Sequence, residues 1–179
     1  MTSFKVVFIG AGGVNFGTPR APWNHSARLE GFTPSPFSPP QKSDFRVLGK
    51  RFKVLAIIDP VRPRAQAVLD NKLARPGADA YKATVLFNDT AEYIGEEPDA
   101  VFIGTPPALR GTMTAGQDVE IVASKKFASS ALFVEKPVSS AYPLDVQPLN
   151  LYFRQTGTFV AVGYMLRYLK GLFNYSTMD

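Results

Sequence analysis

The 179-residue sequence contains no cysteine and only one histidine, His25. Without cysteine the chain forms no disulfide and offers neither a thiolate nucleophile nor a cysteine metal site. The single histidine lies far from the other polar motifs, and we assign it to the start of a helix rather than to catalysis. The candidate catalytic and ligand-binding residues are therefore lysine, acidic residues and glycine, and we predict no metal site.

Long apolar runs and dense blocks of basic charge are also absent. No apolar run approaches the roughly 20 residues needed to span a membrane. The N-terminal run enters glycines without the basic region or cleavage site of a signal peptide. The formal net charge is +5, but the basic residues are scattered, which is typical of a solvated surface. We expect a soluble, cytoplasmic protein with neither nucleic acid nor membrane as a partner.

Short apolar segments alternate with helical patterns along the chain. Apolar residues make up 45% of the sequence and charged residues 20%, as in an ordinary globular domain. Strands are predicted at residues 5–9, 52–58, 83–87, 100–103, 131–134 and 158–162. Helices are predicted at residues 64–73 and 112–127 and from about residue 143, where Pro148 should break or kink the helix. This alternation predicts an α/β fold with a doubly wound parallel sheet.

The first predicted strand ends in glycines. Gly10, Gly12 and Gly13 permit a tight turn and a close approach of the backbone to a phosphate. The usual fingerprint has its third glycine where this chain has Asn15, and two prolines within residues 18–22 should delay the next helix to about residues 24–30. We predict that these three glycines and Asn15 bind a dinucleotide. A strand-to-helix turn that binds no ligand explains them equally well.

Asp59 follows the second predicted strand. An acidic side chain at this place typically accepts a hydrogen bond from the ribose 2′-hydroxyl and disfavours the 2′-phosphate of NADP. Arg62 and Arg64 follow closely and favour a phosphate instead. NAD is therefore the predicted cofactor and NADP the alternative. Asp59 could also serve only as a cap of the helix that follows it.

The strand predicted at residues 131–134 brings Glu135, Lys136 and Pro137 to the carboxyl end of the sheet, where open α/β sheets bind their ligands. Desolvation at such a place lowers the pKa of a lysine, so Lys136 can donate or accept a proton near neutral pH. A surface lysine that merely follows a strand is the alternative interpretation.

The motifs FIGAGG, AIIDP, VFIGTPP, FVEKP and VGYMLRY resemble, in order and position, the N-terminal half of the Gfo/Idh/MocA family of NAD(P)-dependent oxidoreductases. The resemblance implies a Rossmann domain in which Lys136 contacts the reacting hydroxyl or carbonyl group. The residues that it implies at the pyrophosphate and the adenosine ribose are Gly10, Gly12 and Asp59. Those that it implies along the nicotinamide are Thr105, Pro106 and Glu135. Two residues depart from the pattern: Asn15, and Arg110 where the family often has histidine.

A Rossmann domain is predicted over residues 1–163, with a proline-rich insertion at about 31–49 and a helical segment at 164–179. In the family this last segment leads into a second α/β domain, whereas the sequence stops at Asp179. We expect a truncated member without most or all of that domain. Apolar side chains of the segment would then form a homodimer or partner interface, unless the segment folds back on its own domain. They are Met165, Leu169, Leu172 and Phe173.

Three functions are compatible with these patterns. The first is an NAD(P)-dependent oxidoreductase acting on a hydroxyl or carbonyl group of a small sugar- or polyol-like metabolite, with Lys136 as acid or base. The second is a non-catalytic dinucleotide-binding regulator or interaction protein. The third is a truncated family member whose site serves non-redox chemistry. The first is the leading hypothesis because the lysine and the cofactor motifs are both present.

Overall fold

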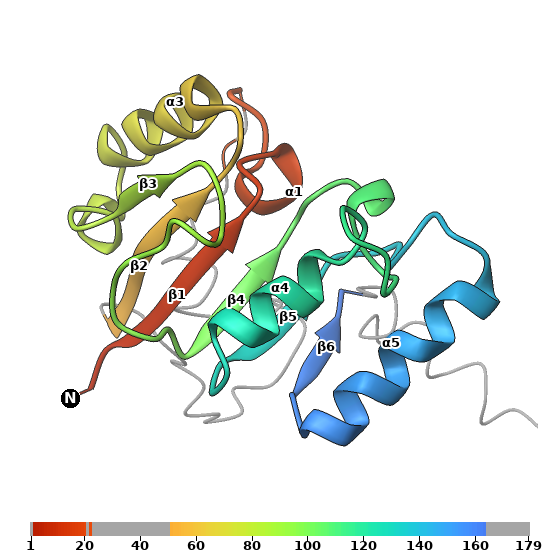
Figure 1. Ribbon diagram of the computed structural model, residues 1–179. Coiled ribbons are helices and arrows are strands. Elements are labelled where there is room, and N and C mark those ends of the chain that lie inside the picture. Colours follow the sequence, from red (N-terminus) through yellow and green to blue (C-terminus); the bar gives the residue numbers. More distant parts are fainter. Residues whose placement is uncertain (1, 21, 23–50, 164–179) are drawn as a thin grey trace, which may run out of the picture.

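The computed structural model describes residues 2–20, 22 and 51–163 of the chain. The helix predicted near residues 24–30, the proline-rich insertion, His25 and the segment at 164–179 lie outside this part. Within it, six parallel strands form one sheet in the order β3-β2-β1-β4-β5-β6 (Figure 1). The strands are β1 (Phe4–Ile9), β2 (Phe52–Ile58), β3 (Val85–Phe87), β4 (Ala100–Ile103), β5 (Ala131–Val134) and β6 (Val160–Val162).

Helices lie in the crossover connections from β2 to β3, from β4 to β5 and from β5 to β6, whereas residues 88–99, between β3 and β4, contain no helix. In the described part of the chain the α-helices are α1 (Gly13–Phe16), α3 (Arg62–Leu73), α4 (Val119–Lys126) and α5 (Pro143–Thr156). The 3-10 helices are η2 (Ala78–Ala80) and η3 (Pro107–Leu109). No helix in these residues has the length and apolar character needed to cross a membrane.

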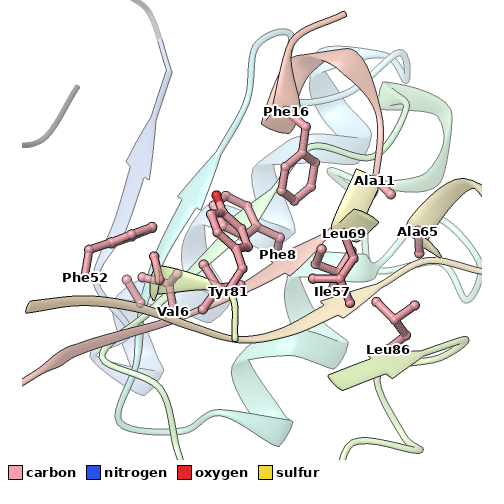
Figure 2. Packing of buried hydrophobic residues seen from close by; sticks show 13 residues of the cluster. Val6, Phe8, Ala11, Phe16, Phe52, Ile57, Ala65, Leu69, Tyr81 and Leu86 are labelled. Atoms are coloured by element: carbon pink, nitrogen blue, oxygen red, sulfur yellow. The ribbon is translucent and has the colours of Figure 1, made fainter. Parts of the chain in front are cut away.

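The core is divided between the two faces of the sheet. Val6 and Phe8 of β1 belong to one cluster, with residues of α1 and α3 (Figure 2). Val7 and Ile9 belong to a second cluster, with residues of α4 and a partly buried side chain of α5. Successive side chains of a strand point to opposite faces, so the two pairs of helices cover opposite faces. Burial on both faces explains why the strands are almost continuously apolar.

The predicted strands and their parallel arrangement are confirmed, although β3 and β6 each begin two residues later than expected. Helix α3 is also confirmed and begins two residues earlier. Its buried face includes Lys72, whereas Leu73, the last residue of the helix, is 42% exposed. The delay predicted for the first helix was wrong, because the one-turn helix α1 begins at Gly13, directly after the glycine turn and before the prolines.

The helix predicted at residues 112–127 was wrong in its first half, since α4 begins only at Val119. Residues 112–118 form turns, in which the Thr112 amide and hydroxyl donate to the Gln117 carbonyl at 3.0 and 3.3 Å. Gly116 has a φ of 84°, a left-handed conformation that interrupts a helix. Ala115, in these turns, and Val122, within α4, are both exposed.

Helix α5 continues through Pro148, so the expected break is absent. A proline inside a helix leaves one carbonyl without its partner, here that of Leu144. Leu144 is 75% exposed, and water can therefore bond to this carbonyl.

Candidate functional site

The residues that follow four neighbouring strands lie in one row at the carboxyl edge of the sheet. The strand pairing aligns the last residues of β1, β4, β5 and β6. Beyond them, the amides of Gly104, Glu135 and Gly163 donate to the last carbonyl of the neighbouring strand at 2.9, 3.1 and 2.9 Å. The strand order reverses between β1 and β4, and ligands of open α/β sheets bind at such a switch point. Gly10 and Gly104 lie there.

The glycine turn after β1 is both tight and open. Gly10 has a φ of 94°, and a Cβ on it would lie 3.1 Å from the carbonyl carbon of Gly104, so the close approach of the two loops requires glycine. A Cβ on Gly12 or Gly13 would meet no atom within 4 Å. In the described part of the chain the amides of Gly12 and Gly13 donate to no protein acceptor. The turn therefore offers free N–H donors beside open space, which fits a phosphate.

Asn15 fills the gap between the glycine turn and Gly104. Its side chain is 7% exposed, and its Nδ2 donates to the carbonyls of Ile9 and Gly10 at 3.1 and 2.7 Å. A Cβ on Gly104 would lie only 2.5 Å from Asn15 Oδ1. Asn15 thus holds the turn against the loop after β4, and its direct contact with a cofactor stays a prediction.

Asp59, at the end of β2, is fully buried and bonded within the protein. Its Oδ2 accepts the amide of Ala11 at 2.7 Å, and its Oδ1 accepts the amide of Val61 at 2.8 Å. The guanidinium of Arg64 bonds both oxygens at 2.8–3.1 Å. Asp59 therefore ties the glycine turn to the start of α3.

Thr105 and Pro106 follow β4 beside the glycine turn. The Thr105 hydroxyl oxygen is buried and has no hydrogen-bond partner in the described part of the chain, although buried polar atoms are almost always bonded. An amide or hydroxyl of a ligand would satisfy it. Pro106 is exposed at the start of η3.

Glu135 and Lys136 follow β5 in the same row of strand ends. Glu135 is partly buried, and its carboxylate lies against Gly163, where a Cβ would collide with it. Lys136 is exposed, so the desolvation that we expected around it is not found among the described residues. The reason is its position, one residue beyond the last bond between β4 and β5. The Lys136–Pro137 peptide is cis.

Two buried charged residues that sequence reasoning did not place in the site hold its loops. Arg110 is 2% exposed; its Nε donates to the Thr105 carbonyl at 2.9 Å and its Nη1 to the Glu135 carbonyl. The guanidinium therefore joins the loop after β4 to the loop after β5. Burial lowers the pKa of Arg110, while the charges of Glu120 and Glu135 oppose that shift.

Glu120, at the start of α4, is 1% exposed. Its Oε2 accepts the Gly111 amide at 3.0 Å, while its Oε1 has no partner in the described residues. Burial raises the pKa of Glu120, against the hydrogen bond from Gly111 and the charge of Arg110. The sequence marked Arg110 only as a departure from a family pattern. Nothing in the sequence pattern identified Glu120, because the helix was expected to begin at residue 112, seven residues before α4.

The strand order and the open glycine turn at the switch point define a dinucleotide-binding Rossmann domain. Comparison with known families agrees. Residues 4–164 match the model of the oxidoreductase family with an NAD-binding Rossmann fold, Gfo/Idh/MocA, and the chain belongs to this family. The resemblance that the sequence motifs indicated is confirmed, and NAD is the cofactor of the fold.

The relatives found are longer than this chain. Two uncharacterized proteins of Schizosaccharomyces pombe are each 36% identical over 174 residues, which is 93% of this chain and 41% or 39% of theirs. A myo-inositol 2-dehydrogenase from Lactobacillus plantarum has the same fold, with a TM-score of 0.57 and 16% identity. A scyllo-inositol dehydrogenase from Lactobacillus casei, solved with NAD(H) and scyllo-inositol, gives 0.57 and 18%. Each structural match covers 98% of this chain and 40% of the other.

Proposed function

We propose that this chain is the cofactor-binding part of an NAD(P)-dependent oxidoreductase that acts on a hydroxyl or carbonyl group of a small polyol- or sugar-like metabolite. One observation carries the proposal. The paired strand ends bring the glycine turn, Thr105 and the Glu135–Lys136 pair to a single edge of the sheet, at the switch point where Rossmann domains bind dinucleotides.

The residues at this edge fit a dinucleotide. Among the described residues the amides of Gly12 and Gly13 have no acceptor and lie beside open space, which suits the pyrophosphate. The Thr105 hydroxyl likewise has no partner there, which suits a polar group near the nicotinamide end. The predicted contacts of Gly10, Asn15, Pro106 and Glu135 with the cofactor belong to this proposal. A bound nicotinamide supplies the capacity to accept or give up hydride.

Lys136 has the role of acid and base in this proposal. When a hydroxyl is oxidised, the neutral amine takes the hydroxyl proton as the carbonyl forms; in reduction, the ammonium returns it. Lys136 is exposed in the described residues, so the desolvation that tunes such a lysine would have to come from bound ligands. The bonds of Arg110 to both loops fix the backbone from which Lys136 reaches the substrate.

The proposed substrate class has indirect support. Two structural neighbours are named as inositol dehydrogenases. This chain spans about two fifths of the length of each. Completion of a substrate pocket by a second copy or by a protein partner is part of the proposal. The residues that we predict for such an interface, Met165, Leu169, Leu172 and Phe173, lie outside the described part of the chain.

Substitution of Lys136 by alanine tests the catalytic role. NAD⁺ reduction should be followed with a panel of polyols and sugars, and NADH binding by fluorescence and calorimetry. We expect Lys136→Ala to lower turnover by roughly 10²- to 10⁴-fold, the usual contribution of a general acid or base. NADH affinity should stay within about threefold of that of the unaltered chain, because the Lys136 side chain is exposed and forms no hydrogen bond with the glycine turn in the described part of the chain. Exposed Lys126→Ala, at the end of α4, is the matched control and should change neither quantity.

The result also separates the alternatives. Tight NADH binding without turnover on any substrate would favour the dinucleotide-binding regulator. Equal turnover by the chain and its Lys136→Ala variant would remove the lysine from the mechanism. Absence of cofactor binding by the folded chain would favour a site that serves other chemistry.

A further inference from the structure

The acidic residue at the ribose end of the site has no exposed surface with which to bind a ribose. The Asp59 side chain is 1% exposed. Each of its oxygens already accepts a backbone amide and at least one N–H of Arg64. NAD selectivity usually depends on such a carboxylate in two ways: it accepts the ribose 2′-hydroxyl, and its charge repels a 2′-phosphate. In this chain neither function is open to Asp59 while Arg64 stays in place.

Arg64 presents the opposite charge at the same place. Its side chain is 50% exposed, and it lies in the first turn of α3. It engages Asp59 through Nε and Nη2, and within the described residues Nη1 forms no hydrogen bond. Arg64 also lines a cavity of about 340 Å³ that reaches Gly12 and Gly13 of the glycine turn. A guanidinium can bond a carboxylate on one edge and a phosphate on another.

Arg62 makes a useful contrast. It also belongs to the first turn of α3, but its Nη1 donates to the carbonyl of Leu86 at 3.4 Å, and among the described residues it forms no hydrogen bond or ion pair with Asp59. The two arginines therefore carry the same charge in neighbouring positions, while Arg64 alone of the two neutralises the carboxylate.

We propose that Arg64 determines the cofactor preference of this site: by covering Asp59 and presenting Nη1, it makes the chain bind NADPH at least as tightly as NADH. The inference rests on the proposed function, since it concerns the ribose end of the same cofactor site. It reverses the preference for NAD that the sequence position of Asp59 indicates.

The test is titration of the full chain and three variants with NADH and with NADPH, by calorimetry and nicotinamide fluorescence. For the unaltered chain we expect a Kd for NADPH equal to or below that for NADH. Arg64→Ala should weaken NADPH binding relative to NADH by at least about tenfold, because a charge-assisted hydrogen bond is lost and the freed carboxylate repels the 2′-phosphate. Arg62→Ala should change the ratio of the two Kd values by less than about threefold.

Arg64→Lys is the control for misfolding of the Arg64→Ala variant. Lysine keeps a positive charge beside Asp59, but it has no fork with which to bond a carboxylate and a phosphate together. We expect it to melt within a few degrees of the unaltered chain and still to lose most of the NADPH advantage. A preference of the unaltered chain for NADH by tenfold or more, or an unchanged ratio in both Arg64 variants, would overturn the inference and leave the proposed function intact. Binding of neither cofactor would overturn both.

Discussion

The contact between Asn15 and Gly104 gives the sharpest test of how the site is held. A Cβ added to Gly104 would lie 2.5 Å from Asn15 Oδ1 and 2.6 Å from Cγ and Nδ2. Ordinary contacts between such heavy atoms are about 3.5–4.0 Å, so Gly104→Ala forces the Asn15 side chain out of its place. The two hydrogen bonds from Nδ2 to the carbonyls of Ile9 and Gly10 are then lost or bent.

The expected cost has two parts. Overpacking in a buried place costs typically about 1–3 kcal/mol. Loss of the Asn15 bonds adds about 1–2 kcal/mol, because the Gly10 carbonyl loses its partner while that of Ile9 keeps the amide of Gly104. We therefore expect Gly104→Ala to lower the free energy of unfolding by about 2–5 kcal/mol, and Asn15→Ala alone by about 1–2 kcal/mol.

The double variant separates this account from a general loss of packing. With alanine at residue 15 the new Cβ at residue 104 meets no amide group, so Asn15→Ala should rescue most of the damage. Urea unfolding of all four proteins, followed by circular dichroism, would give a coupling energy of about 2 kcal/mol or more. Costs that add to within about 0.5 kcal/mol would refute the steric explanation, since sites without contact behave additively. Gly12→Ala, whose Cβ meets nothing within 4 Å, is the matched glycine control.

Two further variants test the site and its buried acid. Gly12→Ala should change the free energy of unfolding by less than about 0.5 kcal/mol, because Gly12 has a φ of −81° and open space around it. The added methyl group should fill the space next to the phosphate and weaken NADH binding by tenfold or more, which calorimetry would detect. Unchanged affinity would place the pyrophosphate elsewhere. Glu120→Gln should stabilise the fold at neutral pH and not in acid. Because burial raises the pKa of Glu120 above its usual 4.5, the stability linked to its neutral form is full below pH 4.5 and is lost as the pH rises through the folded-state pKa. Melting temperatures between pH 4 and 8 would show the difference growing with pH, whereas a difference independent of pH would mean that the charge of Glu120 is not the cause.

The sheet was predictable because its signals are local. Each strand is a short, mainly apolar run that is followed by glycine, asparagine or an acidic residue, and burial on both faces requires that apolar composition. The same property located Gly10, Gly104 and Glu135 at one edge, since the carboxyl ends of parallel strands meet there. The helices were less predictable. The start of α4 depends on turns around Gly111 and Gly116, which have left-handed φ values and whose amides donate to the side chains of Glu120 and Asp118.

Partners of buried charges could not be predicted from spacing. The sequence offered Asp59 and Arg64 as competing arguments for NAD and NADP, and in the fold the two side chains bond each other. The place of Glu120 in the site could not be predicted for a similar reason. Its partners are the amide of Gly111 and the charge of Arg110, and the turns of residues 112–118 bring them beside it. Lys136 was placed correctly at the strand end, but its exposure depends on what lies above the sheet, about which a strand pattern carries no information.

The buried charges share one structural task. The hydrogen bonds of the sheet stop at the strand ends, and the loops beyond must be held by other groups if the cofactor edge is to be rigid. Asp59 holds the glycine turn through the Ala11 amide, and Arg110 holds the loops after β4 and β5 through two carbonyls. Charge-assisted bonds are about twice as strong as neutral ones, while isolated buried charges are costly. Asp59 and Arg110 are buried beside the proposed ligand edge, where fixed loop geometry matters most, and this is the arrangement expected of a preorganised binding site.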